Sequence, residues 1–351
     1  MPLTIPASFS MIGPAILESI SNKQPQFSSL PKPRSLRSLG LDNLNNCRIA
    51  MHVNSYPDDC DRSVANVLIG KLDPNTYIPP YLVNCEFIKE PPNNENITSL
   101  VEGTLGNLGI KDKALFKVLL SDQAAYMVKA GKNLKEIHEG LLHISCLVHG
   151  LHRVAEEVRA MCKKLHKLIT AVKQIYNKSP KRKTDFKAAY PEVSLLPLQF
   201  VSNRWGTWLA AVVHLFKHFD AVYAMVMKMK DEDAAAIPEA KKLLEDQEAV
   251  HELSWVAENL EFIPNTIKAM EEEGLTVERS LELIDSAKFK VENIKGNTEM
   301  EAKWVLRLKE KFESVLEKNP DIGVIRGMSG EQLNPYKYCP VTSVDCERSF
   351  R

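Results

Sequence analysis

The sequence predicts an α/β protein in which a mixed sheet flanked by helices carries a large all-α insertion. Short runs rich in Val, Leu and Ile recur through residues 47–146 and alternate with amphipathic segments. From Leu151 onward the apolar residues recur at spacings of three and four, which is the period of a helix. The chain has 351 residues, 44% of them apolar and 26% charged, so it has enough material for one core with a large insertion or for two domains.

Charge and cysteine content limit the classes of partner. The 45 basic and 45 acidic residues cancel, so any nucleic-acid surface must be a local patch. Seven cysteines without a CxxC pair favour a reducing compartment over a disulfide framework. No run approaches the roughly 18 apolar residues of a membrane span, and the first residues lack the pattern of a signal peptide. We therefore expect an intracellular protein without a membrane partner.

The first part of the chain predicts an antiparallel meander. Residues 1–45 are rich in Ser, Pro and Asn and indicate an irregular lead-in. Strands are expected at residues 47–54, 63–72 and 81–88, because these runs are short, apolar and bounded by turn residues. A helix over residues 95–108 leads to the next strand.

Two strand ends then carry polar side chains. The apolar run 115–120 predicts a buried strand followed by Asp122 and a helix, and the run 141–146 predicts another strand that ends at Cys146. His149 follows as a long amphipathic helix begins. Chemistry in open α/β sheets collects where strands end, so we expect Asp122 to lie near the Cys146 and His149 pair.

Four motifs in this chain resemble those of hAT-superfamily DNA transposases, in the family's order. They are SDxAxYMxKA at residues 121–130, CxxHxLHRVAEE at 146–157, NRWGTWL at 203–209 and CPVTSVDCERSF at 339–350. The resemblance runs from about Asn54 to the last residue. It implies an RNase H-like core interrupted by a helical insertion domain.

The resemblance also implies the domain bounds. The core would span residues 46–178, the insertion 179–320, and the return to the core 321–351, where only the start of the family's dimerisation segment is present. Transposases of this type carry a zinc-binding BED-like finger before the core. Residues 1–45 lack the Cys and His spacing for one, so we expect a fragment or a shortened derivative.

In the family, carboxylates hold two divalent cations, Mg²⁺ or Mn²⁺, that polarise the scissile phosphate. By resemblance Asp122 is the second acid and Glu347 the third. The same register places Asn54 where the first acid belongs. An amide oxygen brings no negative charge to a Mg²⁺ site, so the resemblance implies a site that has lost its metal ions.

Two alternatives for these acids stay open. Asp58 and Asp59 stand in the turn beyond the first strand and are the other candidates for the missing ligand. Asp122 precedes a helix, where an Asp is also expected as an N-cap.

Cys146 and His149 have a zinc interpretation and a structural one. A structural zinc needs four ligands, and the further candidates His152, Cys162 and His166 lie on what we expect to be one continuous helix. By resemblance the pair orders the edge of the active site near the DNA. We favour a buried thiol with a hydrogen-bonded imidazole.

The basic face of this long helix, expected over residues 151–176, is the main candidate for contact with phosphates. A solvated helix face and, for the PKRK sequence at 180–183, a surface loop are the alternatives to DNA binding and a nuclear import signal. By resemblance Arg204 and Trp205 face the DNA end; the alternative is that Trp205 anchors a helix start. The candidate DNA-contacting residues are Arg204, Trp205, Cys146, His149, Arg153, Lys163 and Lys167.

Further helices are expected over residues 205–229, 240–261, 277–293 and 299–317. His214 and His218 stand four residues apart in the first of them, but the Glu of an HExxH motif is missing. We interpret them as core or surface histidines.

We expect a hAT transposase-derived protein that has lost strand transfer, keeps DNA binding and self-association, and retains neither Mg²⁺ nor Mn²⁺. It would be nuclear, otherwise cytoplasmic, with no small-molecule substrate. One alternative is an active metal-dependent transposase or nuclease that uses Asp58 or Asp59 with Asp122 and Glu347. The other is a protein-interaction scaffold without nucleic-acid contact.

Overall fold

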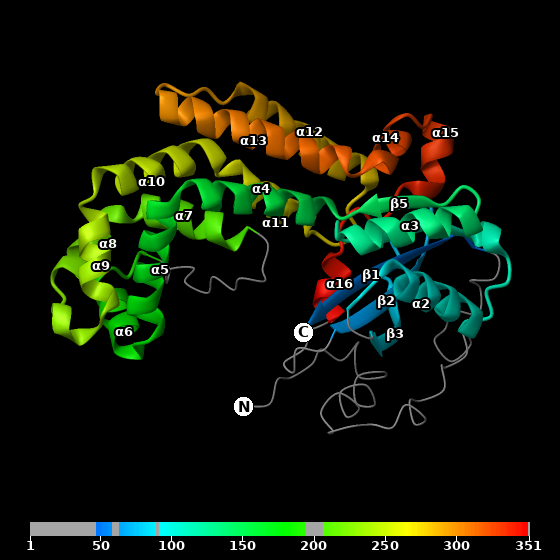
Figure 1. The fold of residues 1–351 in the computed structure, drawn as a ribbon, viewed down its shortest axis with the longest axis horizontal. Coiled ribbons are helices and arrows are strands. Elements are labelled where there is room, and N and C mark those ends of the chain that lie inside the picture. Colours follow the sequence, from blue (N-terminus) through cyan, green and yellow to red (C-terminus); the bar gives the residue numbers. More distant parts are fainter. Residues whose placement is uncertain (1–46, 58–62, 89–90, 194–205, 350–351) are drawn as a thin grey trace, which may run out of the picture. The chain divides into compact units, whose positions relative to one another are not determined.

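The computed structural model describes residues 47–57, 63–88, 91–193 and 206–349. The chain divides into two compact units (Figure 1). The described residues up to Ile144 and from Met328 onward form a sheet unit, and the described residues from Ser145 to Gly327 form a helical unit.

The sheet unit is built on five strands in the order β3-β2-β1-β4-β5. β1 pairs antiparallel with β2, β2 antiparallel with β3, and β1 parallel with β4. The expected meander and mixed sheet are thus confirmed, and this is the RNase H-like α/β class that the sequence predicted. The strands are β1 (Ile49–Pro57), β2 (Ser63–Lys71), β3 (Tyr81–Phe87), β4 (Phe116–Ser121) and β5 (Leu142–Ser145).

One face of this sheet forms a core with two helices, α2 (Asn94–Asn107) and α3 (Ala125–Ile137). Met51, Val67 and Met127 are almost fully buried in it. Burial of apolar area of this kind contributes about 25 cal/mol per Å². The unit is completed by the short helices α15 (Gly330–Leu333) and α16 (Val344–Ser349), and α16 packs against β1 and β2.

Gly131 of α3 allows a buried histidine to approach the helix. A Cβ at this position would lie 2.0 Å from Nδ1 of His143 on β5. The imidazole therefore occupies the space that any other residue would fill. A glycine within an amphipathic helix is the sequence signal of such a close approach.

Apart from Ser145 at the end of β5, the regular elements in the described part of the helical unit are helices. The expected helices over 277–293 and 299–317 are confirmed to the residue, with Thr276 and Thr298 as their N-caps. The helices are α4 (Leu147–Met161), α5 (Lys163–Asn177), α6 (Pro180–Ala189), α7 (Thr207–Lys217), α8 (Phe219–Met227), α9 (Ala236–Leu244), α10 (Gln247–Leu260), α11 (Phe262–Met270), α12 (Val277–Asn293), α13 (Glu299–Glu317) and α14 (Pro320–Arg326).

The expected continuous helix over residues 151–176 is wrong, because the chain breaks between α4 and α5. Cys162 has φ −92° and ψ 72°, outside the helical region. Glu252 of α10, which is 4% exposed, accepts a hydrogen bond of 2.6 Å from the main-chain N–H of Leu165 in the first turn of α5. A carboxylate from a distant helix thus satisfies one of the N–H groups that the break frees.

Two other expectations are corrected, and one alternative for the PKRK sequence is excluded. The helix expected over residues 205–229 is two helices, α7 and α8, whose axes differ by 80°. The helix expected over 240–261 is α9 and α10, and Asp246 between them accepts N–H bonds from Glu248 and Ala249 at 2.9 and 3.1 Å. The PKRK sequence lies in α6 and not in a loop, since Ser179 caps that helix and Pro180 occupies its first turn.

In the described part of the chain, no single helix is long and apolar enough to span a membrane. The bent pair α7 and α8, taken together, has the length and composition of a span.

Within the helical unit, the first residue, Ser145, is bonded to Asn319, which directly precedes α14, and we term this contact the clasp. The side chain of Asn319, which is 3% exposed, accepts from the main-chain N–H of Ser145 at 3.1 Å and donates to its carbonyl oxygen at 2.5 Å. The carboxamide thus pairs with both main-chain groups of one residue, as a neighbouring strand would.

Replacing Gly131 by Ala should destabilise the protein by about 1–3 kcal/mol, because the added Cβ meets the His143 ring. Gly103→Ala in α2 is the matched control, since nothing lies within 4 Å of a Cβ there. Ala is the better helix former, so the control should gain up to about 1 kcal/mol. Urea unfolding measures both, and equal stabilisation of the two variants would contradict the close approach.

Candidate functional site

The sheet position expected to carry the first acid holds only neutral side chains. Asn54 of β1 lies opposite Asn66 of β2, and both side chains are buried, as is that of His52 two residues earlier. Strand alternation puts His52 and Asn54 on the face opposite the α2 and α3 core, which takes Met51 and Val53. Burial lowers the pKa of His52 to about 4, so its imidazole is uncharged at neutral pH.

Asp122 lies at the end of β4, as predicted, but it is not the N-cap of α3. Its Oδ1 accepts a bond of 2.8 Å from the N–H of Ala124, and Ala124 is the N-cap residue. The aspartate closes a turn one step before the helix, because α3 starts two residues later than expected. Its side chain is partly exposed.

The main chain at Asp122 is held by a buried pair that sequence reasoning missed. The Ser121 hydroxyl donates to the carbonyl oxygen of Asp122 at 2.9 Å and lies 2.8 Å from Nε2 of His143. A second tie joins α3 to β1, where the hydroxyls of Tyr126 and Ser55 are 2.6 Å apart. These contacts fix the end of β4 relative to α3 and β1.

The other candidates for the metal site are only partly placed. Glu347 lies in α16, but its side chain is outside the described residues, as are Asp58 and Asp59. Among the described residues no group of three or more His, Cys, Asp or Glu could hold a metal ion. The described donors here are the Asp122 carboxylate and neutral groups. That set does not fit a pair of Mg²⁺ ions, which need several carboxylate ligands.

Cys146 and His149 lie at the start of α4. Cys146 is the residue directly before the helix, and its side chain is fully buried. His149 lies in the first turn of the helix and is half-buried. The further zinc candidates lie on two helices and not one, with His152 on α4 and His166 on α5. The expected closeness of the pair to Asp122 stays a prediction.

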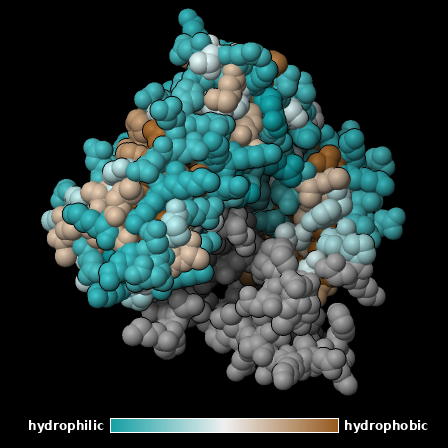
Figure 2. Space-filling view, turned by 60° about the vertical axis from the view of Figure 1, so that its left-hand side comes forward, coloured by the Kyte–Doolittle hydropathy of each residue, from teal (hydrophilic) through white to brown (hydrophobic). Residues whose placement is uncertain are grey.

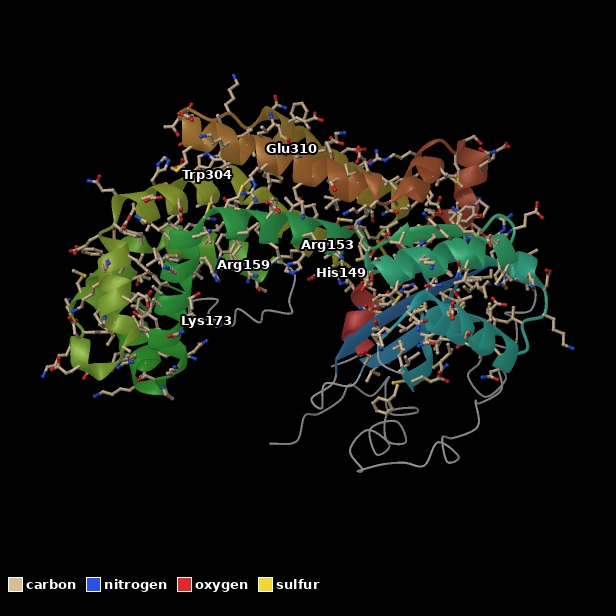
Figure 3. The ribbon with its side chains drawn as sticks, in the orientation of Figure 1. His149, Arg153, Arg159, Lys173, Trp304 and Glu310 are labelled. Atoms are coloured by element: carbon tan, nitrogen blue, oxygen red, sulfur yellow. The ribbon has the colours of Figure 1, made fainter. Side chains whose placement is uncertain are left out.

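The basic helix face is distributed over α4, α5 and α6. Figure 3 shows His149, Arg153, Arg159 and Lys173 along one side of α4 and α5. Within the described chain the side chains of seven cations in these helices and their connections have no ion pair, hydrogen bond or ring contact, and we term them the free cations. They are Arg153, Lys163, Lys167, Lys178, Lys181, Lys183 and Lys187.

Other cations nearby are already engaged. Lys164 Nζ lies 2.8 Å from Asp246 and 2.6 Å from Glu248, and Arg159 pairs with Glu156. Arg182 donates to the main-chain oxygens of Ile175 and Asp233. Sequence alone predicted Lys164 to be part of the basic face, whereas its acidic partners are Asp246 just before α10 and Glu248 in the first turn of α10.

Burial and the positive charges of this region both lower the pKa of two histidines, His152 and His166. Burial, and then the charges of His149, Arg159 and Arg153, lower the pKa of His152 to about 4. Burial and then Arg159 lower the pKa of His166. Arg204 and Trp205, the remaining DNA-contact candidates, lie outside the described residues.

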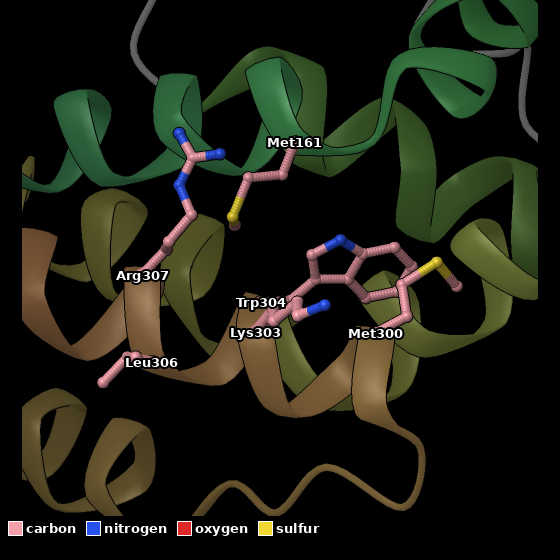
Figure 4. A pocket seen from close by; sticks show the side chains of 6 residues that line it. All are labelled: Met161, Met300, Lys303, Trp304, Leu306 and Arg307. Atoms are coloured by element: carbon pink, nitrogen blue, oxygen red, sulfur yellow. The ribbon is translucent and has the colours of Figure 1, made fainter.

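A pocket of about 390 Å³ lies between α4 and α13 in the helical unit (Figure 4). Its lining has no carboxylate, thiol, hydroxyl or imidazole, so it offers apolar contacts and two cations and no acid–base chemistry. The residues are Met161, Met300, Lys303, Trp304, Leu306 and Arg307. The face drawn in Figure 2 is mostly hydrophilic, with small separate hydrophobic patches.

No protein-family model matches the chain, and no curated protein matches it. Among solved structures it is similar to a chain of the Drosophila P element transposase strand transfer complex. The identity is 11%, and the match covers 96% of this chain and 90% of that chain, with a TM-score of 0.29. The likeness is a coarse one of fold and carries no statement about activity. Membership of the hAT superfamily stays a prediction from the sequence.

Acid should destabilise the protein through His52. Its pKa is about 4 in the folded protein, whereas the ordinary value is 6.5. The contribution of neutral His52 to the free energy of unfolding is therefore complete above pH 6.5 and is lost as the pH falls towards 4. The loss should reach about 3 kcal/mol, from roughly 1.4 kcal/mol per pKa unit. Urea unfolding of the wild type and of His52→Leu at pH 7 and pH 4 measures it. The same pH dependence in both would contradict this role.

Proposed function

We propose that this chain is a transposase-related protein that binds DNA through α4, α5 and α6 and does not catalyse metal-dependent strand transfer. The observation that carries the proposal is the distribution of charge. The buried sheet position that resembles the first-acid site is neutral, whereas α4, α5, α6 and their connections carry the free cations.

The loss of catalysis follows from the ligands. Two-metal chemistry needs carboxylates that hold both ions against their hydration and keep them a few ångströms apart. Asn54 and Asn66 offer carboxamides, and the neutral His52 is buried beside them. Even with Glu347 turned towards Asp122, the site would lack the charge of its first ligand.

DNA binding follows from the local excess of positive charge. Residues 147–190 contain eleven Lys and Arg against three Asp and Glu, although the whole chain is neutral. Residues 231–318 contain twenty-two acidic and twelve basic residues, so the helical unit is polarised. A polyanion is attracted to α4, α5 and α6 and repelled by the acidic helices.

The free cations suit this role better than the paired ones. Lys163 and Lys167 are exposed and one helical turn apart, so both can reach one strand of phosphates. Because they have no carboxylate partner, a phosphate contact displaces only counterions, and that release favours binding. Lys164 would first have to leave Asp246 and Glu248.

The proposal includes nuclear localisation and self-association. Lys181 in the first turn of α6 is exposed and without a described partner, so an import receptor can reach the PKRK sequence there. Self-association is proposed from the resemblance of residues 339–350 to the start of the family's dimerisation segment.

DNA affinity should fall steeply with salt, and the slope should depend on the free cations. In the variant Lys163→Gln/Lys167→Gln the slope of log K against log salt should decrease by about 1 for each cation removed. Lys242→Gln on α9, an exposed lysine in the acidic part, is the control and should leave the slope unchanged. Fluorescence anisotropy with a labelled duplex measures this. A DNA affinity that does not change with salt concentration, or no DNA binding at all, would support the alternative of a protein-interaction scaffold.

The wild-type protein should neither nick nor join DNA in Mg²⁺ or Mn²⁺. A labelled hairpin and a nicked duplex are the substrates, and product is resolved on denaturing gels. Asp122→Asn is the matched variant, since it removes the remaining described carboxylate without changing its shape. Metal-dependent cleavage by the wild type that Asp122→Asn abolishes would overturn the proposed loss of catalysis.

A further inference from the structure

Two histidines meet at the corner between α7 and α8. His214 lies in the last turn of α7, and His218 is the residue at which that helix ends. The N–H of His218 still donates to the carbonyl oxygen of His214 at 3.1 Å, so the two residues keep their helical relation although His218 has φ −121° and ψ 27°. Their ring centroids are 4.5 Å apart and the ring planes are inclined by 55°.

One of these rings has an unsatisfied nitrogen. Nε2 of His214 is buried and has no hydrogen-bond partner in the described part of the chain. Burial, and then the neighbouring His218 and Lys217, lower the pKa of His214 to about 4. Its imidazole is therefore neutral at neutral pH, which is the form that binds metal ions.

We propose that His214 and His218 form a two-histidine site for a transition-metal ion such as Zn²⁺ or Cu²⁺. A Zn–N bond is about 2.0–2.1 Å, so two nitrogen ligands of one ion lie within about 4.2 Å of each other. Rings whose centroids are 4.5 Å apart can each place a nitrogen within that reach. The bound ion would also satisfy Nε2 of His214.

The donor set decides which ions fit. Imidazole nitrogen suits Zn²⁺, Cu²⁺ and Ni²⁺, whereas Mg²⁺ and Ca²⁺ require oxygen ligands. No third His, Cys, Asp or Glu joins the pair within the described residues. With two protein ligands the site is weaker than a closed four-ligand zinc site.

Binding would act on the angle between two helices. His214 belongs to α7, whereas His218 starts α8, and the helix axes differ by 80°. A metal bridge between the two rings restrains the torsions of the residues that form this corner. The consequence is a metal-dependent stiffening of the α7–α8 bend, independent of DNA binding.

Isothermal titration of the full chain, stripped with EDTA, with Zn²⁺ alone should show one ion bound per chain. His214→Gln and His218→Gln should each weaken this binding about tenfold or more, since one ligand remains. His251→Gln is the matched control, because His251 is a half-exposed histidine of α10 that lies 3.1 Å from Glu301 and outside the pair. Mg²⁺ should not bind at this pair. Equal Zn²⁺ affinity in all variants, or no saturable binding by the wild type, would overturn the proposal.

A second measurement needs no variant. Ascorbate reduces bound Cu²⁺ to Cu⁺, and Cu⁺ reduces dissolved O₂ to species that oxidise the histidines holding the copper. Peptide mass spectrometry locates the products. Oxidation should concentrate at His214 and His218 and be suppressed by excess Zn²⁺. Oxidation spread over the other histidines, with this pair spared, would show that the pair binds no copper.

Discussion

The high free-energy cost of burying an unpaired charge decides where this chain places its ionisable side chains. His52 is buried and neutral, and Glu252 is buried against a main-chain N–H group. Lys164 is held by two carboxylates, whereas Lys163 and Lys167 beside it point their charges outward. The same constraint bears on both candidate functions. It leaves the sheet position expected to hold the first acid neutral, which disfavours metal-dependent catalysis, and it leaves a cationic surface on the helices, which favours DNA binding.

Among the described residues, hydrogen bonds fix the end of β4 at Asp122. Ser121 and His143 hold the main chain on one side, and Tyr126 joins α3 to Ser55 on the other. Gly131 is needed because His143 lies directly against the helix. A geometry suited to orienting a carboxylate thus persists although Asn54 supplies no charge.

The strands and two of the long helices could be predicted from the sequence because their signals are local. Strand periodicity defined β1, β2 and β3, and Thr276 and Thr298 marked the starts of α12 and α13. The break at Cys162 could not be predicted, since the carboxylate of Glu252 that caps α5 is 87 residues from Leu165 in sequence. The start of α6 was signalled by Ser179 and Pro180, but the adjacent charges favoured a loop.

For the candidate site, the sequence correctly located Asp122 after a strand and Asn54 within one, since both follow from the strand pattern. The ion-pair partners of charged residues could not be predicted from the sequence. Arg153 and Lys164 look alike in sequence, but Lys164 is paired because the start of α10 brings Asp246 and Glu248 to it, whereas Arg153 is free. Such pairings depend on tertiary packing and leave no periodic signal.

The clasp between Asn319 and Ser145 has a consequence for how this chain could have been assembled. Two positions separated by 174 residues are joined by one side chain, so the intervening polypeptide leaves and re-enters at a single point. A segment with adjoining ends can be gained or removed without pulling apart the strands that flank it. The segment from α4 to α13 therefore has the geometry of a cassette, and replacing it with a few flexible residues would test whether the sheet is self-sufficient.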